Sequence, residues 1–197
     1  MIIIKHRVNT IEELRKTPNN LGVEIDLRSF KDKIIIHHEP FIDGVSFDEW
    51  IKHYKHNFLI LNVKEEGLEN SIMKIINSYE VKKFFFLDQS FPLLIKTVLS
   101  GEPRTAIRIS KYESLETAIN FKNLAKWVWI DYFENFPLND VGLKKLKEAN
   151  FNLCLVSPEL QGFSYEKTVA MKNELLNKNF LFNAVCTKFP DLWGEKI

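Results

Sequence analysis

Short apolar segments alternate with amphipathic segments along the whole chain, and this alternation restricts the fold more than any other feature. The apolar segments are rich in Ile, Val, Leu and Phe and lack a strict two-residue period, which is typical of strands buried on both faces. Eight of them predict strands at residues 2–5, 21–27, 58–63, 83–87, 105–109, 127–130, 152–156 and 183–186. The segments between them predict helices at residues 11–16, 46–53, 70–79, 91–99, 114–121, 140–149 and 165–176.

Strands that alternate with helices pair in parallel through right-handed crossovers. Two architectures are consistent with this order, a (β/α)₈ barrel and a doubly wound open sheet. Eight strands favour the barrel, and no G-x-G-x-x-G follows the first strand to indicate a dinucleotide-binding sheet. Such barrels usually have about 250 residues, whereas this chain has 197. We therefore expect one domain over residues 1–197, a compact (β/α)₈ TIM barrel whose last outer helix is reduced or missing.

Composition excludes several classes of protein. The 27 Lys and Arg nearly balance the 26 Asp and Glu, so no basic excess predicts binding to nucleic acid. No apolar run approaches the roughly 20 residues that span a bilayer, and the N-terminal isoleucines are too few for a signal sequence. We expect a cytoplasmic protein without a stable membrane anchor and with Cys154 and Cys186 as buried thiols. The oligomeric state is not predicted.

Polar residues stand where the predicted strands end, which is where the active site of a (β/α)₈ barrel lies. A further apolar run at residues 34–38 ends on His38. Two histidines on separate strands offer an acid and a base near neutral pH, and the basic residues suit an anionic, phosphoryl substrate. The strand-end residues are His6, Arg7, Glu24, Asp26, His38, Asn62, Lys64, Asp88, Arg108, Asp131 and Glu159.

Glu24 and Asp26 are two residues apart in a predicted strand, so both side chains project from the same face. Adjacent carboxylates repel each other unless a cation or a strong donor lies between them. Carboxylate oxygens are also the ligands that Mg²⁺ and Ca²⁺ prefer, so this strand predicts a divalent-cation site. Asp131 has an alternative role as the cap of the helix after its strand. His53 and His56 lie in a polar segment, and we expect them at the surface.

Taken together, these motifs resemble those of the glycerophosphodiester phosphodiesterases. That superfamily also includes the phosphatidylinositol-specific phospholipases C and the spider sphingomyelinases D, all phosphodiester-cleaving barrels. Asn62-Val63-Lys64 stands where the family has an acid-x-Lys. The other motifs are His6-Arg7, Gly22-Val23-Glu24-Ile25-Asp26 and His38-Glu39-Pro40. The runs FFFLDQSFP, AIRISKYES, WVWIDYF and LVSPEL resemble a bacterial branch of the family.

The resemblance implies a metal-dependent hydrolase of a small glycerol-, inositol- or sugar-linked phosphodiester. His6 and His38 would be the general acid and base of a two-step cleavage through a cyclic phosphate. The ligands of Mg²⁺ or Ca²⁺ would be Glu24, Asp26 and Asn62. The residues that would bind phosphate or substrate are Arg7 and Lys64, with Arg108 and Asp131 as further candidates.

Three departures from the family pattern leave other functions open. Val8 replaces the glycine after His-Arg, with a shortened loop at Asn9-Thr10, and Glu39 replaces an aspartate. Asn62 replaces the third acidic ligand, which removes one negative charge and should weaken cation binding. The first alternative is a non-catalytic phosphate-binding barrel of the same family. The second is an unrelated barrel, such as a sugar-phosphate isomerase or lyase, in which the two histidines are far apart.

Overall fold

A computed structural model describes residues 1–178 and 180–194. The chain divides into two compact units. The N-terminal unit is Ile4–Thr105, and the C-terminal unit contains Met1–Ile3 and the described residues from Ala106 onward. Strand β1 (Ile2–Lys5) contributes residues to both units.

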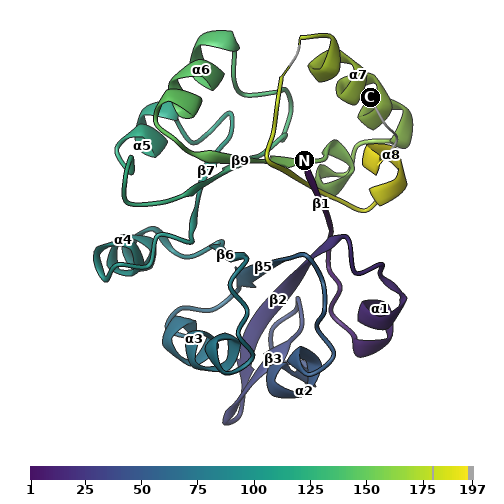
Figure 1. The fold of residues 1–197 in the computed structure, drawn as a ribbon, viewed down its shortest axis with the longest axis vertical. Coiled ribbons are helices and arrows are strands. Elements are labelled where there is room, and N and C mark those ends of the chain that lie inside the picture. Colours follow the sequence, from purple (N-terminus) through teal and green to yellow (C-terminus); the bar gives the residue numbers. More distant parts are fainter. Residues whose placement is uncertain (179, 195–197) are drawn as a thin grey trace. The chain divides into compact units, whose positions relative to one another are not determined.

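Strand β2 (Gly22–Phe30) is the centre of the N-terminal unit (Figure 1). It pairs in parallel with the end of β1 and with β5 (Phe58–Val63), and β5 pairs in parallel with β6 (Phe84–Leu87). On its far half β2 pairs antiparallel with β3 (Lys33–Ile36), which continues to β4 (Val45–Ser46). The register places Asp26 opposite Asn62, so the ends of β2 and β5 present polar side chains together.

Four helices accompany this sheet, and one of them, the first, begins with a side-chain cap. Thr10 forms a capping box with Glu13 at this helix. The Ser46 side chain, by contrast, makes no capping hydrogen bond. Ile25, Leu59, Trp50 and other buried side chains form the hydrophobic core. The helices are α1 (Ile11–Lys16), α2 (Phe47–Ile51), α3 (Glu69–Ser78) and α4 (Phe91–Leu99).

The C-terminal unit is built on four parallel strands in sequence order. Cys154 and Cys186 are buried in two of these strands as free thiols, as expected, and burial raises the pKa of the Cys154 thiol. The strands are β7 (Ala106–Ile109), β8 (Trp127–Ile130), β9 (Asn152–Val156) and β10 (Ala184–Thr187). The helices are α5 (Leu115–Ile119), α6 (Asp140–Glu148), the 3₁₀ helix η1 (Pro158–Gln161), α7 (Tyr165–Asn177) and α8 (Pro190–Gly194).

The observed elements follow the predicted ones closely. Each of the eight predicted parallel strands is present, and the further run that ends at His38 is the antiparallel strand β3. Strand β2 runs three residues past its predicted end because β3 pairs with it, and the short β4 was not predicted. The last helix within the described residues is α8, Pro190–Gly194. None of the helices in the described ranges is long and apolar enough to cross a membrane.

Candidate active site

Hydrogen bonds to Glu24 hold the segment that follows β1. Arg7 adopts a left-handed backbone with φ of 53°, a conformation that costs roughly 1–3 kcal/mol for a residue other than glycine. Its amide N–H donates to Glu24 Oε2 at 2.7 Å, and the Val8 amide donates to the Glu24 carbonyl at 2.8 Å. These bonds hold the turn and place His6 Nε2 3.8 Å from Glu24 Oε2.

Glu24 and Asp26 are both buried, and Glu24 lies between the polar groups of two other segments. Asn62, on the neighbouring strand β5, donates from Nδ2 to Glu24 Oε1 at 2.9 Å. Burial, followed by repulsion from Asp26, raises the pKa of Glu24 to about 7. The Arg7 amide and the Asn62 amide act in the opposite direction because they donate to the ionised form. Glu24 and Asp26 therefore repel each other when both are ionised, and a positive charge beside them reduces that repulsion.

Cationic side chains surround Asp26. Lys64 Nζ lies 3.3 Å from Asp26 Oδ1 and 3.4 Å from Asp88 Oδ2, and Arg7 Nε lies 3.7 Å from Asp26 Oδ2. The Asn9 side chain makes two hydrogen bonds to Asp26. Its Nδ2 donates to Asp26 Oδ2 at 2.8 Å, and its Oδ1 accepts from the Asp26 amide at 3.1 Å. Arg7 and Lys64 thus place two positive charges beside the acid pair, where an anionic substrate group can bind.

The predicted cation ligands Glu24, Asp26 and Asn62 offer carboxylate and amide oxygens. In the described part of the chain, no three residues of the types His, Cys, Asp and Glu form a metal-binding group. Asp26 Oδ1 and Asn62 Oδ1 are nevertheless buried oxygens without a hydrogen bond, although the Lys64 ammonium faces Asp26 Oδ1. Two carboxylates and an amide oxygen fit a hard divalent cation, and a cation would relieve the repulsion that raises the pKa of Glu24.

His38 lies beyond the end of β3, on a segment that remains attached to β2. The His37 amide donates to the Asp26 carbonyl at 3.0 Å. His38 Nδ1 lies 2.5 Å from Glu39 Oε1, and the hydrogen bond and charge of His38 lower the pKa of Glu39, with smaller contributions from the charges of Arg7 and Arg28. A carboxylate that accepts from Nδ1 orients the ring and leaves Nε2 for proton transfer.

Arg28 connects the segment of His38 to the segment of Lys64, a link that the sequence analysis did not predict. It follows Asp26 by two residues in β2, so Glu24, Asp26 and Arg28 share one face of the strand. Its Nε donates to the His38 carbonyl at 2.9 Å and its Nη1 to the Lys64 carbonyl at 3.3 Å. The two-residue period was visible in the sequence for Arg28, whereas no sequence signal connected Asn9 to Asp26.

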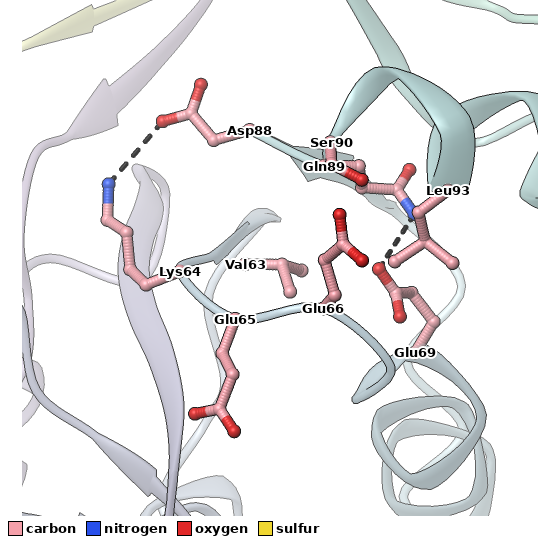
Figure 2. Close-up of a pocket in the computed structure, with 9 residues that line it drawn as sticks. All are labelled: Val63, Lys64, Glu65, Glu66, Glu69, Asp88, Gln89, Ser90 and Leu93. Carbon is pink, nitrogen blue, oxygen red and sulfur yellow. Dashed lines mark hydrogen bonds and ion pairs between the residues drawn. The ribbon is translucent and has the colours of Figure 1, made fainter. Parts of the chain in front are cut away.

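A pocket of about 290 Å³ opens beside Lys64 in the same unit (Figure 2). Lys64 points toward Asp88, and Gln89 Nε2 donates to Glu69 Oε1 at 2.9 Å. Carboxylates outnumber cations around it, so its charge disfavours a phosphate group. Its lining is Val63, Lys64, Glu65, Glu66, Glu69, Asp88, Gln89, Ser90 and Leu93.

Arg108 and Asp131 belong to the C-terminal unit, where they pair with each other. Asp131 is buried and also accepts from Trp129 Nε1 at 3.3 Å and from Gln161 Nε2 at 2.6 Å. Arg108 Nε lies 3.7 Å from Glu113 Oε1. Both Asp131 oxygens thus accept from side chains, and the helix that follows β8 is capped by Asn139 instead. A role of Arg108 in substrate binding stays a prediction.

The expectation that His56 is a surface residue is wrong. Its side chain is buried, its Nε2 donates to the Thr17 carbonyl at 2.9 Å, and burial lowers its pKa. The reason is packing, since its ring lies 5.8 Å from the ring of Tyr54. A polar segment predicted exposure, whereas this histidine connects α1 to the start of β5.

Comparison with known proteins supports the fold. No protein-family model matches the sequence, and no curated protein sequence matches it either. A glycerophosphodiester phosphodiesterase from Agrobacterium tumefaciens strain C58 superposes with a TM-score of 0.69 at 12% identity, over 98% of each chain. A glycerophosphoryl diester phosphodiesterase from Parabacteroides distasonis ATCC 8503 gives 0.67 at 13% identity, over 98% of this chain and 85% of that one. These neighbours are TIM barrels, so the chain has the predicted barrel fold, and the family resemblance read from the motifs is supported at the level of fold.

Proposed function

We propose that this protein is a phosphodiester hydrolase that acts on a small glycerol-, inositol- or sugar-linked phosphodiester. The observation that carries the proposal is the buried Glu24–Asp26 pair with Arg7 and Lys64 beside it and His6 at its edge. The two structural neighbours, whose names describe cleavage of glycerophosphodiesters, support the same class of reaction. The choice of a glycerol-, inositol- or sugar-linked substrate is proposed together with the class of reaction.

Arg7 and Lys64 would bind the non-bridging oxygens of the phosphate. In the first step a substrate hydroxyl attacks phosphorus, and one histidine takes its proton while the bond to the leaving alcohol breaks. The other histidine gives a proton to the leaving oxygen, and water then opens the cyclic phosphate with the two roles reversed. His38 is suited to this exchange because Glu39 holds its Nδ1 side and leaves Nε2 for the substrate.

Mg²⁺ or Ca²⁺ would be held by Glu24, Asp26 and the Oδ1 of Asn62. When bound, the cation would supply positive charge that neutralises the phosphate and acidifies the attacking hydroxyl. Two carboxylates provide less negative charge than three, so we propose weak cation binding. Arg7 and Lys64 contribute positive charge at the same site whether or not the cation is bound.

The test is hydrolysis of glycerophosphodiesters by the purified protein with Mg²⁺ or Ca²⁺ present. We expect His6→Ala and His38→Ala each to lower kcat by about a hundredfold or more, the usual effect of losing a general acid or base. His53→Ala is the matched control, because this histidine lies near Arg15 and away from the acid pair. Wild-type rates in either active-site variant would exclude the two-histidine mechanism.

Asn62 favours a second candidate, a phosphate-binding protein of the same fold without turnover. This candidate predicts that the protein binds glycerol phosphate and that Lys64→Ala weakens the binding, while no phosphodiester is cleaved. Cation-dependent hydrolysis that is lost in His38→Ala would exclude it.

A further inference from the structure

Lys64 and Asp88 directly follow the ends of two neighbouring strands. Strands β5 and β6 are parallel, and their register pairs Asn62 with Leu87, so both strands end at the same edge of the sheet. The Lys64 side chain is 18% exposed and the Asp88 side chain is 27% exposed. Because both side chains are partly shielded from water, this ion pair is screened less than one on the open surface. Its arrangement can therefore affect what binds beside it.

The Lys64 ammonium lies between two carboxylates, and its hydrogen bond goes to Asp88. Its Nζ is 3.3 Å from Asp26 Oδ1 and 3.4 Å from Asp88 Oδ2. The contact with Asp88 has the geometry of a hydrogen bond, and Figure 2 shows the ammonium pointing toward that carboxylate. Asp26 Oδ1, by contrast, is a buried oxygen that accepts no hydrogen bond from any described residue. One oxygen of the acid pair thus remains available as a ligand.

The backbone of Lys64 is held at both of its polar groups. Its amide donates to the Leu27 carbonyl at 3.0 Å, and its carbonyl accepts from Arg28 Nη1 at 3.3 Å. The ammonium can therefore move only by rotation of the side chain, toward one carboxylate or the other. Asp88 has a left-handed backbone with φ of 59°, a conformation that aspartate adopts more readily than most residues.

We propose that Asp88 is a positioning residue that draws the Lys64 ammonium away from Asp26 Oδ1 and so keeps this oxygen available to a divalent cation. This inference rests on the proposed function, because it uses the cation ligands assigned there. An ammonium bonded to Oδ1 would occupy the same lone pairs and would repel a divalent cation beside it. Asp88 thereby offsets part of the weakness caused by Asn62, since it holds the competing positive charge of Lys64.

The inference is tested by calorimetric titration of the substrate-free protein with Ca²⁺, in a double-mutant cycle of Asp88 and Lys64. Asp88→Asn should lower the cation affinity about tenfold, because the ammonium then turns to Asp26. Asparagine tolerates a left-handed backbone, so this change should not disturb folding. In the Lys64→Met background no ammonium competes, and the same change should lower the affinity by no more than about twofold. Asp88→Glu keeps the carboxylate and should retain most of the wild-type affinity.

Glu66→Gln is the matched control for the loss of one negative charge. Glu66 is exposed, lines the same pocket as Lys64 and Asp88, and has no contact with Lys64 among the interactions of the described residues. Its replacement should leave the cation affinity close to the wild-type value. If Glu66→Gln weakened binding as much as Asp88→Asn does, the charge of Asp88 alone would explain its effect and the inference would be overturned.

The outcomes separate this inference from the proposed function. An effect of Asp88→Asn that is equal with and without Lys64 would overturn the inference, because Asp88 would then act as a direct ligand. Wild-type protein that binds no Ca²⁺ would overturn it as well, while cation-independent hydrolysis would leave the two-histidine mechanism in place. An effect that requires Lys64 would support the inference even if the protein hydrolyses no phosphodiester, a result that would overturn only the proposed function.

Discussion

Asn62 donates a hydrogen bond from Nδ2 to Glu24 Oε1 at 2.9 Å, across the neighbouring strands β2 and β5. An acidic residue at this position could not stabilise an ionised Glu24 in this way, because a carboxylate has no proton to donate at neutral pH. The same amide leaves its Oδ1 buried and without a hydrogen bond. Asn62 therefore stabilises the acid pair in the absence of a cation and still retains one oxygen as a potential ligand.

Asn62→Asp should raise the affinity for Mg²⁺ or Ca²⁺ by about tenfold or more, because it adds a third carboxylate to the set. In the absence of cation the same change should lower the free energy of unfolding by roughly 1–3 kcal/mol, since three buried acids then repel one another and a hydrogen bond is lost. Calorimetric titration and urea denaturation measure the two effects. Asn57→Asp, at an exposed position, is the control. Equal cation affinity in wild type and variant would exclude Asn62 from the ligand set.

Glu24→Gln should stabilise the cation-free protein at high pH more than at low pH. The pKa of Glu24 is raised from 4.5 to about 7 in the folded state, so between these values the unfolded chain loses a proton that the folded chain keeps. The resulting penalty is absent below pH 4.5, grows through that window and reaches a limit of about 3 kcal/mol above pH 7. Glutamine removes the penalty, so the stability difference should increase from pH 4.5 to pH 8. Urea denaturation across this range measures it, with the exposed Glu12→Gln as the reference, and a pH-independent difference would contradict the buried-acid interpretation.

His56→Gln should make stability less sensitive to mild acid. Burial lowers the pKa of His56 in the folded state, so below the unfolded value of 6.5 the unfolded chain binds the proton more readily. Stability is therefore lost as the pH falls through that value, while glutamine keeps a donor for the Thr17 carbonyl and does not titrate. Thermal unfolding at pH 7.5 and pH 5.5 checks the effect. His53→Gln, which is not buried, should show the wild-type difference between the two pH values.

Arg28→Gln should lower kcat by about tenfold and change KM much less, because Arg28 positions the segments of His38 and Lys64 through their carbonyls. Steady-state kinetics of the variant separates the two parameters. Guanidinium added to the assay should restore part of the rate, which a general loss of folding would not permit. An equal kcat in Arg28→Gln and in the surface variant Arg15→Gln would show that Arg28 has no such role.

Much of the fold followed from local patterns in the sequence. The eight parallel strands were predicted because each is a short apolar run bounded by turn residues, and a strand that is covered on both faces has that composition. The antiparallel pairing of β3 was not predicted, since it depends on a turn that brings residues 27 and 36 together. His56 was misplaced for a related reason, because its burial arises from Tyr54 and the end of α1 rather than from its polar neighbours in sequence.

By itself, the sequence determined the order of the strands and helices and the shared face of Glu24 and Asp26, because the period of a strand depends only on neighbouring residues. Only the tertiary structure decided which groups meet the acid pair. Asn9 reaches Asp26 across 17 residues, and Asn62 reaches Glu24 across 38. Such contacts depend on strand register and burial, which the whole chain sets together. The same burial raises the pKa of Glu24 and makes the charge on this pair depend on what binds beside it.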